Sequence, residues 1–373
     1  MERSDERTRA GNIEAVSLDK IAVRLIGLRY PWWRLAIGGL IVLLTAIFAS
    51  TQGSVDIPFM AVVKILISRI PGVASASDLP STWDTILWQL RIPRVVLAAI
   101  VGAALAMSGA AYQGLFKNPL ADPYLIGVAS GAGLAATIVL LTGVPLVILG
   151  ISVLPIAAFA GGIGAVVAAY SVARSSQGTP LTTLILAGVA ISALAGAVSS
   201  LLMIRSDPDL RPVLSWLLGS FISAEWNESG IALLYLIPSV GVILGFARTL
   251  NVLQFSEEHA VALGVDVERV KLILIGMATL ATATAVSFSG LIGFVGLVAP
   301  HVVRLIWGVD YRFILPMSGL VGATFLVLAD LIARTAVSPA ELPVGIVTAF
   351  CGAPFFLYIL RRRRVRGIGP GLQ

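Results

Sequence analysis

The chain has 373 residues, of which 57% are hydrophobic and 12% are charged, and its mean hydropathy is +0.95. Soluble domains carry about 25% charged residues, so this composition excludes a soluble globular protein and indicates a polytopic membrane protein. The net charge is +6. The basic residues lie at the ends of apolar runs, which argues against nucleic-acid binding. The single cysteine, Cys351, excludes an intramolecular disulfide, and no Cys/His cluster is spaced to hold a metal.

Apolar runs long enough to cross a bilayer predict ten membrane spans. They lie near residues 35–52, 92–115, 124–142, 146–173, 180–205, 229–248, 270–289, 294–308, 313–334 and 342–360. Basic residues favour the cytoplasmic side, and 19 of the 26 Lys and Arg residues fall in segments assigned inside. We therefore expect a cytoplasmic tail over 1–34, a transmembrane domain over 35–361 and a cytoplasmic tail over 362–373.

Two segments between the early spans have distinct patterns. The amphipathic run VDIPFMAVVKILISRI, residues 55–70, is expected to lie on the outer surface. The stretch GLFKNPLADPYLIGVASGAG, residues 114–133, contains Asn118-Pro119 and Asp122-Pro123. Proline lacks an amide donor and disfavours helix at the residue before it, so this stretch should end one helix and delay the next.

Glycines predict where the helices approach closely, since membrane helices pack through small residues. Such faces are expected at Gly127 and Gly131, around Gly161, Gly162 and Gly164, and at Gly290, Gly293 and Gly296.

Six motifs follow one another along the chain: RIPR at 91–94, NPLADP at 118–123, EEHAVALGVDVERVK at 257–271, GLIGFVGLVAPHVVRL at 290–305, ADLIAR at 329–334 and ELPVGIVTAFCGAPFF at 341–356. In order and spacing the chain resembles the FecCD family of permease subunits, over residues 34–362. These subunits belong to type II ABC importers for ferric siderophores, haem and cobalamin. The resemblance implies an all-α membrane fold with ten transmembrane helices per subunit.

The resemblance also implies partners. They are a second copy of the chain, two cytoplasmic ATP-binding subunits that hold ATP and Mg, and a periplasmic or lipid-anchored binding protein. The sequence contains no GxxxxGK[ST] phosphate loop. We therefore expect a permease in the inner membrane that is not itself an enzyme and binds no cofactor.

The segment EEHAVALGVDVERVK lies between spans six and seven, and Gly264 is expected to divide two short helical pieces. In the family this element inserts into a groove on the ATPase. The resemblance therefore assigns coupling to seven residues: Glu257, Glu258, His259, Ala260, Leu263, Gly264 and Val265. The alternative is an interfacial connector whose acidic residues only suit the helix dipole.

The resemblance places Arg91, Arg94 and Arg334 where glutamates of the binding protein dock. Guanidinium groups suit this role because they hold carboxylates bidentately. Alternatives remain open for each residue. Arg334 lies four residues after Asp330, at the spacing of an intrahelical pair, whereas Arg91 and Arg94 could anchor at lipid headgroups.

The resemblance further implies a cytoplasmic gate, built from Asn118, Pro119 and Leu120 in the broken segment and Thr182 and Thr183 at the start of span five. Irregular backbone at membrane depth survives only where protein or a watery cavity covers it, as a gate requires. The alternative is a connector that does not move.

The expected cargo is an iron chelate, either a ferric siderophore or haem, with cobalamin as the alternative. Neither His259 nor His301 has an evident partner for iron ligation. An ion-coupled secondary transporter is disfavoured because only Asp330 comes near a midplane carboxylate. A channel is disfavoured because no ring of charge or filter-like motif occurs.

Overall fold

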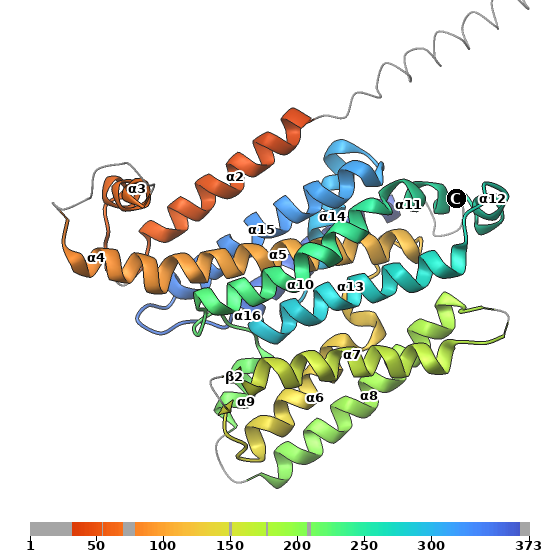
Figure 1. Ribbon diagram of the computed structural model, residues 1–373, viewed down its shortest axis with the longest axis horizontal. Coiled ribbons are helices and arrows are strands. Elements are labelled where there is room, and N and C mark those ends of the chain that lie inside the picture. The colour runs from red at the N-terminus through yellow and green to blue at the C-terminus, as the bar shows by residue number, and fades with distance from the viewer. Residues whose placement is uncertain are drawn as a thin grey trace, which may run out of the picture. The chain divides into compact units, whose positions relative to one another are not determined.

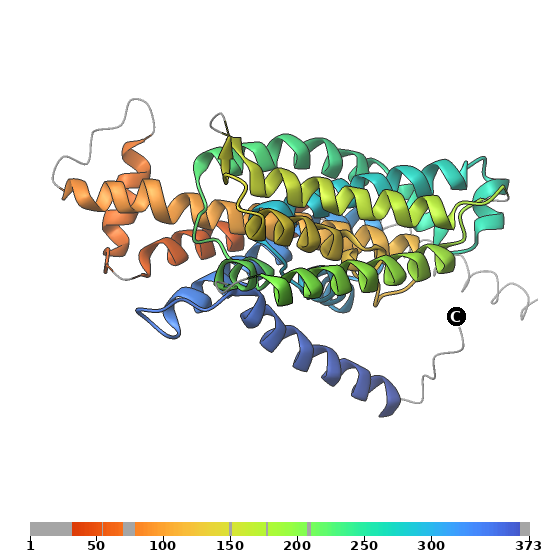
Figure 2. The same ribbon diagram turned by 90° about the horizontal axis from the view of Figure 1, so that it is seen from below.

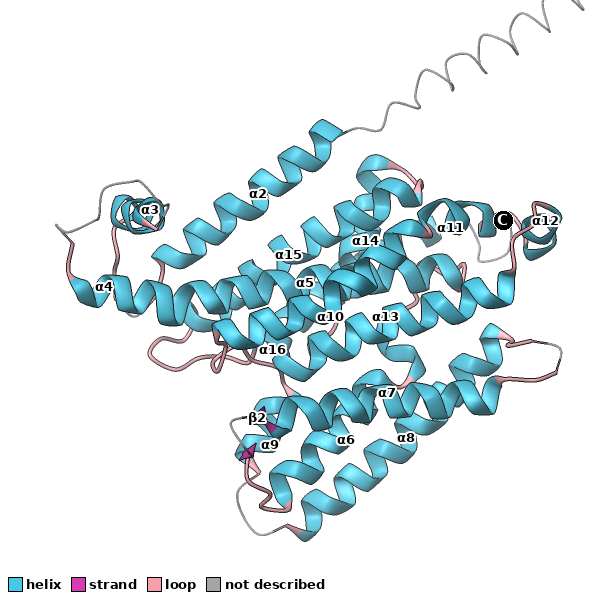
Figure 3. Ribbon diagram, in the orientation of Figure 1, coloured by secondary structure: helices cyan, strands magenta, loops and turns pink. Residues whose placement is uncertain are grey.

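The computed structural model describes residues 32–53, 55–69, 79–148, 151–176, 178–206 and 210–365. Most of the two predicted tails, over 1–34 and 362–373, lies outside these residues. The chain divides between Ile37 and Gly38, and the account below concerns the unit that begins at Gly38. The described part is almost entirely helical (Figure 3).

The elements in chain order are α2 (Trp32–Thr51), α3 (Phe59–Ser68), α4 (Ser81–Thr85), η1 (Ile86–Arg91), α5 (Ile92–Leu115), η2 (Pro123–Ile126), α6 (Val128–Leu141), β1 (Val147–Ile148), β2 (Ile151–Ser152), α7 (Val153–Ala173), α8 (Leu181–Arg205), α9 (Arg211–Leu217), α10 (Trp226–Gly245), α11 (Ala247–Leu253), α12 (Glu257–Ala262), α13 (Val267–Ser289), α14 (Val295–Trp307), α15 (Tyr311–Thr335) and α16 (Val344–Val365). The two short strands pair as an antiparallel hairpin between α6 and α7.

Among the described residues, seven helical runs are long and apolar enough to cross a membrane: α2, the continuous run Ser81–Leu115, α7, α8, α10, α13 and α15. The helices α6, α14 and α16 add three shorter apolar runs. Together they overlap the ten predicted spans. The largest differences are that the second run begins at Ser81 rather than at 92, and that α7 begins at Val153 rather than at 146. The prediction of an all-α polytopic membrane protein is confirmed.

Helix α5 lies at the centre and contacts α10, α13, α14 and α15. Small residues allow these contacts. A Cβ at Gly109 would lie 2.1 Å from the carbonyl oxygen of Gly296 on α14, and a Cβ at Gly102 would lie 2.3 Å from that of Gly322 on α15. The backbones therefore approach closely at these two crossings, as expected for helices surrounded by lipid.

Helices α6, α7 and α8 pack together, and α6 and α7 contact α13 (Figure 1). The predicted glycine contact is present here, because a Cβ at Gly161 would lie 2.4 Å from the Gly131 carbonyl oxygen. Two of the other predicted positions do not pack this way. No atom lies within 4 Å of a Cβ built at Gly164 or Gly293.

The helical bundle has two ends, which are named here by their short helices. The α12 end carries α11, α12 and the start of α13, whereas the α4 end carries α3, α4, η1 and the start of α10 (Figure 1). Helix α16 leans away from the other helices toward its C-terminal end (Figure 2). Helix α3 packs on η1 through Val62, Ile65 and Leu87, while Lys64 is exposed, as predicted for an amphipathic surface segment.

Candidate functional site

Arg91 ends η1 and lies buried against the C-terminal end of α2. Its Nη1 donates to the carbonyl oxygens of Ser50, at 3.0 Å, and Thr51, at 2.9 Å, and its Nη2 donates to that of Val55. The last carbonyl oxygens of a helix lack hydrogen-bond donors within the helix. The Arg91 guanidinium supplies donors to two of these oxygens at the end of α2.

Arg94 and Arg334 share the buried carboxylate of Asp330, which is 1% exposed. Arg94 donates to Asp330 at 2.8 and 2.9 Å and to Glu341 at 2.9 Å. The intrahelical pair that the sequence left open as the alternative for Arg334 is present, with Arg334 Nε 3.5 Å from Asp330 Oδ2. Arg334 also donates to the carbonyl oxygen of Gln52 at 2.6 Å. Each candidate docking arginine therefore has partners within the chain, and Asp330 is paired rather than available to an ion.

The broken segment between α5 and α6 has the predicted form. Helix α5 ends at Leu115, α6 begins at Val128, and η2 occupies part of the gap. Asn118 Oδ1 accepts from the amide of Leu120 at 2.9 Å, and Asp122 Oδ1 accepts from that of Tyr124 at 2.8 Å. Asn118 and Leu120 are exposed, whereas Pro119 is half-buried.

An unusual backbone angle and a long-range hydrogen bond distinguish this segment. Lys117 has a φ of 50°, a left-handed conformation that is unusual outside glycine. The Tyr124 hydroxyl donates to the carbonyl oxygen of Ile292 at 3.0 Å, which joins the segment to the loop after α13. Burial raises the pKa of Asp122 to about 6, although the amide of Tyr124 opposes the shift.

The segment EEHAVALGVDVERVK differs from prediction in one respect. Helix α12 ends at Ala262, and Gly264 follows with a φ of 81°. The second helical piece is not separate, because α13 runs from Val267 to Ser289. Asp266 caps its start by accepting from the amide of Arg269 at 3.1 Å. The residues after Gly264 therefore begin the long helix α13. The apolar run continues without a break beyond Lys271, which explains why one helix forms.

The seven candidate coupling residues lie on or just after α12. Ser256 caps this helix by accepting from the amide of His259 at 3.0 Å, and Ala260 is buried beneath it. Glu257 and Glu258 are exposed, Val265 is half-buried, and Leu263 is 71% exposed. Phe255, just before α12, and Val261, within it, are also exposed, at 82% and 60%, so several apolar side chains face outward around this short helix.

Thr182 and Thr183 lie in the first turn of α8 and are exposed. Glu268 and Lys271, which were not among the predicted site residues, connect this region to α12. Their spacing of three residues on a predicted helix was the available signal. The structure adds the contact that the spacing cannot reveal, since Glu268 Oε2 accepts from the backbone amide of Thr179 at 2.9 Å.

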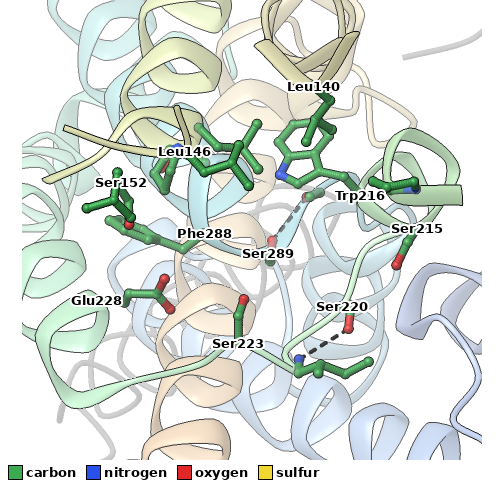
Figure 4. A pocket seen from close by; sticks show the side chains of 17 residues that line it. Leu140, Leu146, Ser152, Ser215, Trp216, Ser220, Ser223, Glu228, Phe288 and Ser289 are labelled. Atoms are coloured by element: carbon green, nitrogen blue, oxygen red, sulfur yellow. Dashed lines mark hydrogen bonds between the residues drawn. The ribbon is translucent and has the colours of Figure 1, made fainter. Parts of the chain in front are cut away.

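A cavity of about 430 Å³ lies between the β1–β2 hairpin, α9, the start of α10 and the end of α13 (Figure 4). Six serines line it: Ser152, Ser215, Ser220, Ser223, Ser287 and Ser289. Glu228 points toward it, and within the described ranges Glu228 Oε2 has no hydrogen-bond partner. These residues come from separate elements, so no local motif could predict the cavity. The described residues contain no cluster of three His, Cys, Asp or Glu side chains that could hold a metal.

Comparison with known proteins identifies the architecture. The model of the FecCD transport family matches residues 40–362. The chain belongs to the FecCD transport family. It is therefore a multi-pass permease component of an ABC transporter and not an enzyme.

Individual FecCD relatives are similar in sequence to this chain over most of its length. The cobalamin import system permease protein of Halobacterium salinarum is 47% identical over 289 residues, which cover 78% of this chain and 77% of the relative. The hemin transport system permease protein of Yersinia pestis is 39% identical over 341 residues, 90% of this chain and 98% of the relative. A solved ABC transporter of metal-chelate type, in an inward-facing conformation, matches with a TM-score of 0.77 and 32% identity, covering 89% of this chain and all of that chain.

Proposed function

We propose that this chain is the membrane-spanning subunit of an ATP-driven importer that moves an iron chelate, either a ferric siderophore or haem, into the cytoplasm. Two copies would enclose the path, with two ATP-binding subunits that hold ATP and Mg, and a binding protein that delivers cargo. The N- and C-termini and the α12 end would face the cytoplasm in the inner membrane. The predominance of basic residues in the segments assigned inside supports this orientation.

The observation that carries the proposal is the α12 surface. Phe255, Val261 and Leu263 are 82%, 60% and 71% exposed at one end of a membrane-spanning bundle. The sequence contains no phosphate-binding loop, so the energy of ATP must come from another subunit. These side chains supply an apolar surface on which that subunit could act.

At the opposite end, Arg91, Arg94 and Arg334 are proposed to dock the binding protein. All three already have partners within the chain: backbone carbonyl oxygens for Arg91, and Asp330 for Arg94 and Arg334. Docking would therefore require a carboxylate of the binding protein to share these guanidinium groups or to replace one of their present partners. Of the two carboxylates that pair with these arginines, Glu341 is the more exposed, with 33% of its side chain accessible against 1% for Asp330. We propose that Asn118, Pro119, Leu120, Thr182 and Thr183 form the gate at the α12 end.

Cobalamin is a second candidate cargo. The observation in its favour is the 47% identity to a permease whose name assigns it cobalamin import. Relatives named for hemin and Fe(3+) dicitrate transport support the iron-chelate proposal.

Replacement of Leu263 by Asp tests the energy-coupling surface. The variant should lose copurification with the ATP-binding subunit, because a carboxylate would replace an exposed apolar contact. Val337→Asp is the matched control, since Val337 is also exposed, at 51%, but lies at the α4 end. Equal recovery of the ATP-binding subunit with wild type and Leu263→Asp would remove α12 from the interface.

A further inference from the structure

A carboxylate on α13 holds the loop between α7 and α8. Glu268 Oε2 accepts from the amide of Thr179 at 2.9 Å, and Thr179 is only 3% exposed. Gly178 beside it has a φ of 114°, and a Cβ at this position would lie 3.0 Å from Glu268 Cδ. The loop backbone is thus held directly against the first turn of α13.

Lys271 extends this connection to α12. Its Nζ lies 3.0 Å from Glu268 Oε1 and 2.9 Å from Glu257 Oε2, so one ammonium bridges two carboxylates from different helices. The Lys271 side chain is 7% exposed. A largely buried ammonium is costly without partners, so these contacts favour a fixed arrangement more strongly than surface ion pairs would.

Proline makes the connection to α8 stiff. Pro180 has no amide, so the amide of Thr179 is the last backbone donor before α8. Pro180 is the N-cap residue, with a φ of −63°, and its carbonyl oxygen accepts from the amide of Leu184 at 3.1 Å. Because the proline ring fixes φ, displacement of Thr179 carries into the turn that holds Thr182 and Thr183.

We propose that Lys271 and Glu268 are positioning residues that transmit movement of α12 to the start of α8. Four residues form the route: Glu257, Lys271, Glu268 and Thr179. The inference rests on the proposed function, in which the ATP-binding subunit moves α12, and it adds a specific path by which that movement reaches the proposed gate. A purely structural ion pair would stabilise the fold without linking nucleotide state to α8.

The test measures nucleotide-dependent access at α8 in the assembled transporter. Cys351 is replaced by Ser, and Thr183 by Cys as the reactive probe. A water-soluble maleimide then reports the modification rate in nucleotide-free complex and in complex trapped with ATP and vanadate. The variants are Lys271→Met, which removes both ion pairs, Lys271→Arg, which restores the charge, and Glu268→Gln, which keeps the acceptor for Thr179. Arg269→Met is the matched control, because the 2.8 Å pair between Arg269 and Asp266 lies on the same helix end but is exposed.

In the parent complex, trapping should change the rate about fivefold or more, the lower end of typical coupling between sites. The ratio of the modification rates with and without trapping should be near unity in Lys271→Met and Glu268→Gln. It should return to the parent value in Lys271→Arg and remain at that value in Arg269→Met. If trapping changed the modification rate of either Lys271→Met or Glu268→Gln as much as it changes that of the parent, the proposed route would be wrong. If Lys271→Met fails to assemble, the result for Glu268→Gln decides. No response in a parent complex that binds nucleotide would reject the proposed function together with the route.

Discussion

At the scale of single residues, the ion pair between Arg94 and Asp330 makes the sharpest prediction about stability. Replacing Arg94 by Met leaves the buried Asp330 carboxylate with Arg334 3.5 Å away as its nearest charge partner. Breaking a buried pair costs about 3–5 kcal/mol. The temperature of thermal unfolding in detergent should therefore fall strongly.

The control for this variant is Arg69→Met. Arg69 pairs with Asp84 at 2.6 Å, but the two side chains are 45% and 43% exposed. An exposed pair contributes at most about 1 kcal/mol. Equal shifts for the two variants would contradict the assignment of Asp330 as a buried, Arg94-dependent carboxylate.

Asp122 makes a prediction about pH. Burial raises the pKa of its carboxyl from 3.8 to about 6, so the folded state binds a proton more readily than the unfolded state. Wild-type stability should therefore fall as pH rises from about 4 to about 6, by roughly 2–3 kcal/mol from this group. Asp122→Asn keeps the acceptor for the Tyr124 amide but cannot titrate.

The stability of Asp122→Asn relative to wild type should thus increase across this pH range. Unfolding curves at half-unit pH intervals provide the comparison. Parallel pH profiles for the two proteins would show that Asp122 does not titrate there.

At the scale of elements, glycine contacts set the distance between helices. A Cβ at Gly161 would lie 2.4 Å from the Gly131 carbonyl oxygen, whereas a Cβ at Gly164 would have no neighbour within 4 Å. Gly161→Ala should cost about 1–3 kcal/mol because α6 and α7 must separate. Gly164→Ala on the same helix should change the unfolding temperature little. A larger loss for Gly164→Ala would contradict the described packing of α6 and α7.

Much of the element order could be predicted from hydropathy and proline. The span predicted at 92–115 coincides with α5, and the two X-Pro pairs correctly predict the gap before Val128. The prediction of a separate short helix after Gly264 was wrong, because α13 begins directly after its N-cap Asp266 and continues without a break to Ser289. A local pattern could not distinguish a short helix from the first turn of a long one.

At the scale of the whole molecule, the family could be predicted from six ordered motifs, but the contacts among distant residues could not. The three arginines were predicted as a group, and spacing indicated the pair between Arg334 and Asp330. The bonds from Arg91 to the α2 carbonyls and from Arg94 to Asp330 depend on tertiary packing. Thr179 and Glu268 are 89 positions apart. Only the folded chain brings them into contact, so the sequence alone could not indicate a link between α12 and α8.

The most direct test of the central claim is uptake by proteoliposomes that contain the chain with its ATP-binding subunits and cognate binding protein. Haem, a ferric siderophore and cobalamin are compared side by side, with and without ATP, and the chain alone is tested under an imposed ion gradient. The account predicts uptake of an iron chelate that requires both ATP and the binding protein. Uptake by the chain alone down the gradient, or no ATP-dependent uptake of any chelate by an assembled complex, would contradict it.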